Sequence, residues 1–307
     1  MNLQQKENLL KELHKILPDQ QISQDVLLAS HTSFGIGGPA DFLLRVGKKE
    51  ELKKVLSLCR TTDCPKLVLG RGTNILFRDK GYRGIIIRLA GSFEKAAVKN
   101  SFLKAGGGCL LSEVATLAAE QSLTGMEFSY GIPGTVGGGV VMNAGAYGKE
   151  MQDLVTEVQT MDERSVSRTY SGREMDFGYR SSILQEKEEV VTAVTFALKR
   201  GCTDNIRQKT EELQKRRWEK QPLDLPSAGS FFKRPEGHYA GALIEKAGLK
   251  GYGIGGAQVS EKHAGFIVNR RNATAEEVIK LMDYVQKEVF RKFKVKLSPE
   301  IKIVGEE

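Results

Sequence analysis

The stretch GMEFSYGIPGTVGGGVVMNAGAYG, residues 125–148, is the most informative part of the chain. It holds eight glycines, and residues 131–148 carry no charged side chain. A surface loop would be more polar, and a strand in the core would hold fewer glycines. We therefore expect this backbone to lie against a large, flat ligand. A set of buried turns without a ligand is the alternative.

A second glycine-rich loop, VLGRGTNIL at residues 68–76, directly follows an apolar strand. Its successive N–H groups could bind a phosphate, although a tight turn without a ligand explains the pattern equally well. GIGGPA at residues 35–40 fits the string G-x-G-x-x-A but lacks an apolar strand before it and a helix after it. This context argues against a Rossmann site. The phosphate-binding string G-x-x-x-x-G-K-[ST] does not occur.

Composition limits the classes of function. The net charge is +8, but no run of five or more basic residues occurs, which weakens a nucleic-acid-binding interpretation and leaves an anionic small molecule. The four cysteines match no zinc pattern and are expected to be reduced thiols, so no metal site is expected. No apolar stretch of 18 residues and no apolar leader occurs, so we expect neither a membrane span nor a signal peptide.

Hydrophobic periodicity and turn residues predict an alternation of helices and strands. With 307 residues the chain can form two or three domains. We expect three parts, 1–90, 91–202 and 203–295, whereas 296–307 could pack back on the second. Helices are expected at 3–16, 50–60, 112–121, 203–219 and 274–293. Strands are expected at 41–46, 66–69, 75–77, 84–89, two near 93–105, 154–162, 166–170, 188–200 and 294–304.

Five motifs occur together in one order: LGRGTNIL at 69–76, the 125–148 segment, FGYRSS at 177–182, PSAGSFFKRP at 226–235 and LSPEIKIVG at 297–305. As a set they resemble the UDP-N-acetylenolpyruvoylglucosamine reductase family, and the resemblance extends from about residue 30 to residue 305. It implies an α+β fold. Its parts would be a two-part FAD-binding domain of the p-cresol methylhydroxylase/vanillyl-alcohol oxidase type and a smaller α+β substrate-binding domain. The short 240–272 region is similar to members of the shorter type.

The resemblance also implies a reaction. NADPH would reduce non-covalently bound FAD, and the flavin would reduce the enolpyruvyl group of UDP-N-acetylglucosamine enolpyruvate to UDP-N-acetylmuramate. This is a step of peptidoglycan precursor synthesis, and hence of cell-wall biogenesis, cell shape and cell division. A cytoplasmic monomer without a nucleic-acid partner is expected. The implied FAD-binding residues are Gly70, Arg71, Gly72, Thr73, Asn74, Ile132, Pro133, Gly134, Thr135, Gly137, Gly138, Asn143, Ala144 and Gly145.

Three residues match the family's catalytic positions. Arg180 would bind the substrate carboxylate as charge develops on it, because a planar guanidinium suits a carboxylate. Ser230 would be the proton donor and Glu300 would help to polarise the substrate. Considered alone, they would be a surface arginine, a turn serine and an exposed strand-edge carboxylate.

The implied substrate-binding residues are Tyr147, Arg217, Lys233 and Arg234. The family often has asparagine where this chain has Arg234. Two alternatives stay open. One is an oxidase of the same flavin fold that acts on alcohols or phenols, and the other is a basic nucleic-acid-binding protein, which would need aromatic side chains on a basic face.

Overall fold

The computed structural model describes residues 3–307, and its contacts divide the chain into two compact units. Unit 1 comprises the residues up to Gln24, Phe42–Gly70 and Gly84–Arg217. Unit 2 comprises Asp25–Asp41, Arg71–Arg83 and Trp218–Glu307. The division into 1–90, 91–202 and 203–295 stays a prediction.

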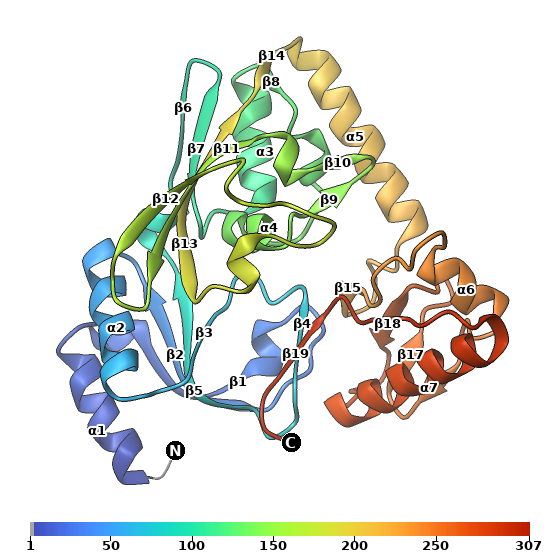
Figure 1. Cartoon of the computed structure of the whole chain (residues 1–307), viewed down its shortest axis with the longest axis horizontal. Coiled ribbons are helices and arrows are strands. Elements are labelled where there is room, and N and C mark those ends of the chain that lie inside the picture. The colour runs from blue at the N-terminus through green and yellow to red at the C-terminus, as the bar shows by residue number, and fades with distance from the viewer. Residues whose placement is uncertain (1–2) are drawn as a thin grey trace. The chain divides into compact units, whose positions relative to one another are not determined.

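Helices occur in both units (Figure 1). The α-helices are α1 Leu3–His14, α2 Lys49–Thr61, α3 Leu111–Glu120, α4 Val136–Val141, α5 Thr203–Lys220, α6 Ala240–Lys246 and α7 Ala275–Phe293. Short 3-10 helices are η1 Asp19–Gln21, η2 Leu28–His31, η3 Gly91–Glu94, η4 Glu127–Ser129, η5 Met151–Asp153 and η6 Ile183–Gln185. In residues 3–307 none of the helices has the length and apolar character needed to cross a membrane.

Unit 1 is built mainly from two sheets. The first has the order β1-β2-β5-β3, with β1 Ile22–Leu27, β2 Pro39–Val46, β3 Lys66–Val68 and β5 Tyr82–Leu89. Residues 25–27, 39–41 and 82–83 of these strands are assigned to unit 2. The second is antiparallel with the order β12-β11-β13-β7-β6, from β6 Ala96–Lys99, β7 Phe102–Gly106, β11 Val155–Asp162, β12 Ser167–Ser171 and β13 Glu189–Ala197. Two short pairs complete the unit: β8 Leu123–Thr124 with β14 Lys199–Arg200, and β9 Gly145–Ala146 with β10 Lys149–Glu150.

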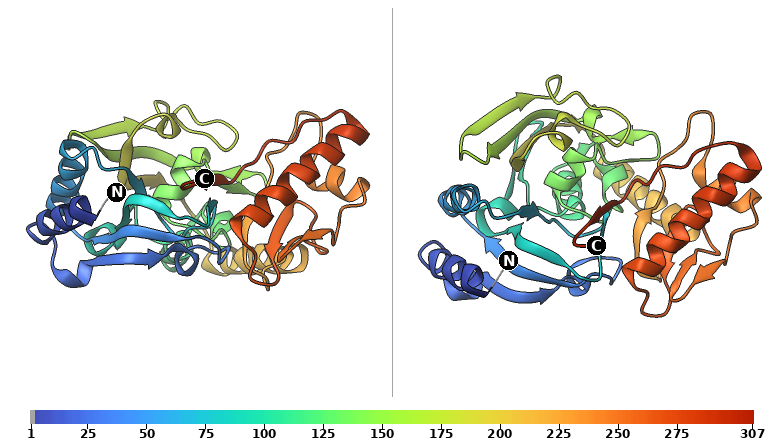
Figure 2. Two further views of the ribbon diagram at one scale, coloured as in Figure 1. Left: turned by 90° about the horizontal axis from the view of Figure 1, so that it is seen from below. Right: turned by 60° about the horizontal axis from the view of Figure 1, so that its bottom comes forward.

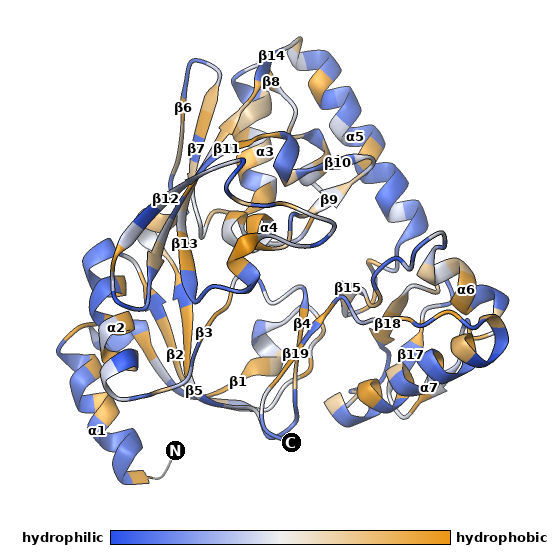
Figure 3. Cartoon of the chain, viewed as in Figure 1, coloured by the Kyte–Doolittle hydropathy of each residue, from blue (hydrophilic) through white to orange (hydrophobic). Residues whose placement is uncertain are grey.

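Each sheet of unit 1 has its own hydrophobic core. Helices α1 and α2 cover the first sheet, and α2 contributes Leu52, Val55, Leu56 and Cys59. Their 3–4-residue spacing puts them on one face of the helix. Helices α3 and α4 pack with the second sheet. Helix α5 is mostly hydrophilic (Figure 3) and buries only Ile206 and Leu213.

Unit 2 has one core, which draws on three separate stretches of the chain. Its antiparallel sheet has the order β15-β18-β17-β16, from β15 Ser227–Ser230, β16 Gly253–Ile254, β17 Ala257–Val259 and β18 Phe266–Asn269. Helix α7 lies along one side of the unit (Figure 2) and packs its apolar face into this core. The terminal strand β19, Lys302–Val304, pairs in parallel with β4, Ile75–Phe77.

Two expectations from the sequence are corrected. The strand expected at 294–304 is wrong for most of its length, because only Lys302–Val304 is a strand. Lys294 ends α7 in the left-handed conformation, with φ 59°. No helix was expected within the glycine-rich stretch, but its residues VGGGVV form the helix α4.

Candidate active site

Arg180 lies at the tip of a tight turn in unit 1. The amides of Gly178 and Ser181 each donate to the other residue's carbonyl oxygen, at 3.1 and 3.2 Å. Arg180 has φ 53°, a left-handed conformation that is uncommon for a residue with a side chain. The side-chain amide of Gln185 donates to the Arg180 carbonyl oxygen at 2.8 Å. The surrounding chain therefore holds Arg180 in a strained conformation, as is typical of functional positions.

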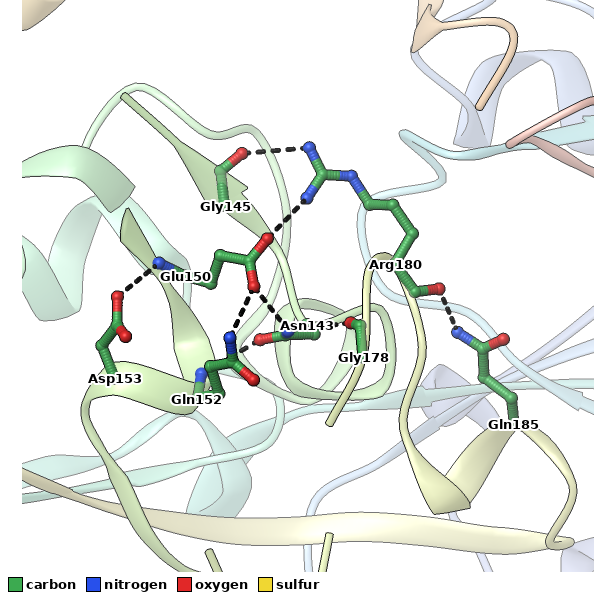
Figure 4. Close-up of polar contacts among 8 residues, drawn as sticks. All are labelled: Asn143, Gly145, Glu150, Gln152, Asp153, Gly178, Arg180 and Gln185. Carbon is green, nitrogen blue, oxygen red and sulfur yellow. Dashed lines mark hydrogen bonds and ion pairs between the residues drawn. The ribbon is translucent and has the colours of Figure 1, made fainter. Parts of the chain in front are cut away.

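The guanidinium group of Arg180 contacts Gly145 and Glu150 (Figure 4) and also lies near the ring of Tyr179. Its Nη2 donates to the carbonyl oxygen of Gly145 at 3.2 Å, and its Nη1 lies 4.0 Å from Oε1 of Glu150. Its Cζ lies 5.2 Å from the ring centroid of Tyr179. These contacts fix the direction of a half-buried cation, which is the requirement for binding a carboxylate at a defined place.

Asn143 joins the glycine-rich segment to the Arg180 turn (Figure 4). Its buried side-chain amide donates to Glu150 Oε2 and to the Gly178 carbonyl oxygen, both at 2.9 Å. Its Oδ1 accepts from the amide of Gln152 at 3.0 Å. Since both amide hydrogens bind protein groups, Asn143 holds the end of the glycine-rich segment against the Arg180 turn.

The glycines of α4 serve two purposes. A Cβ on Gly137 would lie 3.0 Å from the Gly107 carbonyl oxygen, and one on Gly139 would lie 3.1 Å from Leu111 Cδ1. These two glycines are therefore closely packed inside the protein, and the contact of this backbone with a ligand stays a prediction. Gly138 is exposed, and a Cβ there would meet only Thr135 Oγ1, at 3.5 Å.

The two glycine-rich loops meet inside unit 1. A Cβ on Gly70 would lie 2.5 Å from Oγ1 of Thr135, so only glycine allows this approach. Thr135 is buried and caps α4 by accepting from the amide of Gly138 at 3.4 Å. Just before it, the Gly134 carbonyl oxygen accepts from the amide of Leu111 at 3.1 Å. Of the predicted cofactor residues, Gly70 and Thr135 thus lie side by side, and Gly138 is exposed.

Tyr147 and Arg217 belong to the same unit. Tyr147 has φ 57°, and its hydroxyl donates to the Leu213 carbonyl oxygen at 2.9 Å. Arg217 is half-buried beside Gly131, where burial lowers the pKa of its guanidinium. Its Nε is buried without a hydrogen-bond acceptor among residues 3–307. An unsatisfied buried donor of this kind costs about 1–3 kcal/mol of stability.

In unit 2, Ser230 and Glu300 lie on adjacent segments. Ser230 is exposed at the end of β15, directly after Gly229, whose φ is 79°. The next residue, Phe231, accepts at its carbonyl oxygen from the amide of Glu300 at 2.9 Å. The side-chain amide of Asn74 donates to the Glu300 carbonyl oxygen at 3.3 Å. Three positions from three separate motifs are thereby brought together.

The loop of residues 71–74 is tied to β15 through Ser33. The Gly72 carbonyl oxygen accepts from the amide of Ser33 at 3.0 Å, and the Ser33 hydroxyl donates to the Ser227 carbonyl oxygen at 2.7 Å. Gly72 has φ 64°, and a Cβ there would clash with the carbonyl oxygen of His31. Arg71 is exposed, and Thr73 is partly buried.

The predicted cationic residues of unit 2 follow β15. The amide of Lys233 donates to the Ser298 carbonyl oxygen at 2.8 Å. Arg234 is exposed, and its Cζ lies 4.4 Å from the ring centroid of Tyr239. Arg180, Tyr147 and Arg217 belong to unit 1. Their convergence with Ser230, Glu300, Lys233 and Arg234 stays a prediction.

The sequence analysis missed Glu150, Gln185 and Ser33. Glu150 comes two residues after the glycine-rich segment, so extending that segment slightly would have included it. Ser33 carries no recognisable local pattern, because its partner Ser227 is distant in the sequence, and Gln185, five residues after Arg180, belongs to none of the recognised motifs. Within residues 3–307 no group of three or more His, Cys, Asp or Glu side chains could hold a metal ion.

Comparisons with known proteins define the class. The family model of the FAD binding domain matches residues 39–166. The structure is similar to wild-type Phl p 4.0202, a glucose dehydrogenase, with a TM-score of 0.50 at 14% identity over 64% of this chain and 44% of that one, a likeness of fold alone. The chain is therefore an FAD-dependent oxidoreductase with the α+β fold of the p-cresol methylhydroxylase/vanillyl-alcohol oxidase type.

More similar relatives define the family. The family model of the UDP-N-acetylenolpyruvoylglucosamine reductase C-terminal domain matches residues 221–304. The reductase of Caldanaerobacter subterraneus subsp. tengcongensis is 51% identical over 300 residues, covering 98% of this chain and 99% of the relative. The chain therefore belongs to the UDP-N-acetylenolpyruvoylglucosamine reductase family. That of Clostridium botulinum (strain Alaska E43 / Type E3) is 44% identical, covering 97% of each. The crystal structure of the Thermus caldophilus reductase has a TM-score of 0.80 at 37% identity, covering 91% of this chain and 98% of that one.

Proposed function

We propose that this protein reduces the enolpyruvyl group of UDP-N-acetylglucosamine enolpyruvate to give UDP-N-acetylmuramate, with NADPH as the reductant. The reaction would take place in the cytoplasm, as a step of peptidoglycan precursor synthesis, and a monomer would suffice for it. The observation that carries the proposal is the environment of Arg180, a half-buried cation held in one direction by Gly145, Glu150 and Tyr179. The family to which the chain belongs supports the choice of substrate.

FAD fits the residues present. The loop Gly70–Asn74 and the residues 132–135, Gly137, Gly138 and 143–145 are the proposed holders, because Gly70 and Thr135 approach closely and Gly138 is exposed. Bound FAD would supply the hydride-transfer chemistry between the two substrates. The protein's part is to position the reactants, to stabilise charge and to supply a proton.

Arg180 binds the substrate carboxylate. When the double bond is reduced at its β-carbon, negative charge develops on the α-carbon and spreads into this carboxylate. A planar guanidinium that is already oriented stabilises that charge without reorganising. Ser230 donates its hydroxyl proton to the α-carbon and recovers a proton from solvent, and the carboxylate of Glu300 helps to polarise the substrate.

The diphosphate of the substrate needs cations. Arg217 and Lys233 offer half-buried charges, and Arg234 offers an exposed one. The stacking of Arg234 with Tyr239 lowers the mobility of its guanidinium. Tyr147 fixes the backbone beside the Arg180 site through its bond to Leu213.

The experiment that tests the proposal is an anaerobic absorbance spectrum of the purified protein. Flavin bands should bleach with NADPH and return when UDP-N-acetylglucosamine enolpyruvate is added, and NADH in a parallel titration measures the preference for the donor. Bleaching without reoxidation would reject the substrate. Bleaching by alcohols or phenols would favour an oxidase, and a colourless protein that takes up no FAD would reject the whole assignment.

A further inference from the structure

Glu150 is held from two sides beside Arg180 (Figure 4). Its Oε2 accepts from the side-chain amides of Asn143 and Gln152, both at 2.9 Å. Its Oε1 lies 4.0 Å from Arg180 Nη1. Two donors on one oxygen fix the plane of the carboxylate, so the second oxygen faces the guanidinium in a set direction.

The 4.0 Å separation is too long for a hydrogen bond but short enough for a strong electrostatic interaction. The carboxylate therefore orients the guanidinium without a directional bond to it. The directional bonds are elsewhere, from Nη2 to the Gly145 carbonyl oxygen and from Gln185 to the Arg180 carbonyl oxygen.

Only a carboxylate can meet all these demands. A glutamine at position 150 has one oxygen and one NH2 group. If its oxygen accepted from Asn143 and Gln152, its NH2 would face the Arg180 cation; if it were flipped, the NH2 would face the two amide donors. Either arrangement opposes donors to one another and removes the negative charge.

We propose that Glu150 is a positioning residue, which acts through Arg180 to set the direction of its guanidinium during the reaction. This inference rests on the role of Arg180 in the proposed function. Because Glu150 acts through Arg180, its effect should concern the step in which charge develops on the substrate carboxylate, and not the binding of FAD or the oxidation of NADPH.

The test compares Glu150→Gln with wild type and with Asp153→Asn. Asp153 is the matched control, because its Oδ2 accepts from the Glu150 amide at 3.0 Å and an asparagine can still accept there. Flavin content and melting temperature are measured first. Should Glu150→Gln not retain flavin, Glu150→Asp, which keeps the charge on a shorter side chain, takes its place.

Two readouts separate positioning from a structural role. In anaerobic stopped flow, Glu150→Gln should slow reoxidation by the enolpyruvyl substrate about tenfold or more, because misorientation of a catalytic group is costly. Reduction by NADPH should change less than about twofold if the effect is confined to that step. Titration of the oxidised protein with the same substrate should give a Kd within about threefold of wild type. Glu150→Asp should be intermediate and Asp153→Asn should resemble wild type.

A double-mutant cycle with Arg180→Lys decides whether Glu150 acts through Arg180. We expect Glu150→Gln to add little to the loss already caused by Arg180→Lys, because the two residues are coupled. Losses that multiply, or a Glu150→Gln protein that reoxidises at the wild-type rate, would overturn the inference.

Failure of the inference and failure of the proposed function give different results. If wild-type flavin is not reoxidised by the enolpyruvyl substrate, the proposed function fails and the inference fails with it. If wild type is reoxidised, Arg180→Lys is slow and Glu150→Gln is unaffected, only the inference is overturned.

Discussion

The main-chain amide of Glu300 donates a 2.9 Å hydrogen bond to the carbonyl oxygen of Phe231. Phe231 directly follows Ser230, so the two proposed catalytic residues of unit 2 lie on paired segments although 226–235 and 297–305 are separate motifs. Asn74 bonds the same residue, Glu300, from a third motif. A shift of the backbone at Phe231, Glu300 or Asn74 should therefore move the other two residues as well.

Replacing Ser230 with alanine tests the proton donor. We expect Ser230→Ala to keep FAD and to be reduced by NADPH normally, while reoxidation by the enolpyruvyl substrate falls by roughly 10²–10⁴-fold, the usual contribution of a general acid. Ser227→Ala is the control, because Ser227 lies on the same strand and its carbonyl oxygen, retained in the variant, accepts the Ser33 bond. Normal reoxidation of the Ser230→Ala protein would exclude Ser230 as the donor.

Gly72→Ala tests the close approach in the cofactor loop. The variant combines a left-handed φ of 64° with a clash against the His31 carbonyl oxygen. Gly237→Ala has a similar φ, 69°, but a Cβ there has nothing within 4 Å. The strained φ costs on the order of 1–3 kcal/mol in both variants, and overpacking adds about 1–3 kcal/mol to the first alone. Thermal melting should place Gly72→Ala below Gly237→Ala by roughly 5 °C; equal melting temperatures would show that the loop can relax.

His263 should make stability depend on pH. Burial lowers the pKa of its imidazole, and its Nδ1 accepts from the amide of Gly265 at 3.1 Å, which a protonated ring could not do. Because the unfolded chain then binds a proton more readily, stability should be lost as pH falls below about 6.5, the ordinary value for histidine. Urea midpoints of His263→Gln should fall less steeply over this range than those of wild type. The exposed His238→Gln is the control, and parallel curves for all three proteins would contradict the prediction.

The four thiols should differ in reactivity. Burial raises the pKa of Cys59 to about 12 and also raises the pKa of Cys109, whereas Cys202 is exposed. Since the thiolate is the reactive form, a disulfide reagent at pH 8 should modify one thiol quickly in the native protein and all four in denaturant. Cys202→Ser should remove the fast reaction. A fast reaction that persisted in this variant would indicate that a buried thiol becomes exposed through opening of its unit.

The sequence predicted those elements whose local pattern agrees with their packing. Helix α7 is the clearest case: the spacing of Val278, Leu281, Val285 and Val289 gives one apolar face, and Thr274 caps its start by accepting from the amide of Glu277 at 3.2 Å. The antiparallel pair β11 and β12 was likewise expected and is confirmed.

The elements that the sequence did not predict depend on tertiary contacts. Helix α4 contains three consecutive glycines, which are poor helix formers. It forms because Gly137 and Gly139 fit closely against Gly107 and Leu111. The strand expected at 294–304 shows the reverse case: the local sequence favours a strand, but tertiary pairing is missing for most of it. Its apolar and basic composition is typical of a strand, yet only its last residues pair with another strand.

The candidate site shows the same limit. The resemblance supplied Arg180, Ser230 and Glu300, and the pairing of residues 231 and 300 brings two of them close together. It did not supply Glu150, which comes from another stretch of the chain, or Gln185, which follows Arg180 by five residues but lies outside the FGYRSS motif. Which side chain orients which is set by the fold, and it cannot be inferred from spacing along the sequence.

The core of unit 2 combines Phe34 and Leu76 with residues that follow Trp218, and its last strand, β19, pairs with β4. This discontinuity orders events during synthesis on the ribosome. All residues of unit 1 have been made once Arg217 is added, so that unit can begin to fold while translation continues. The early segments of unit 2 must wait for the final residues, and a message truncated near its 3′ end would yield a chain in which Phe34 and Leu76 have no complete core to join.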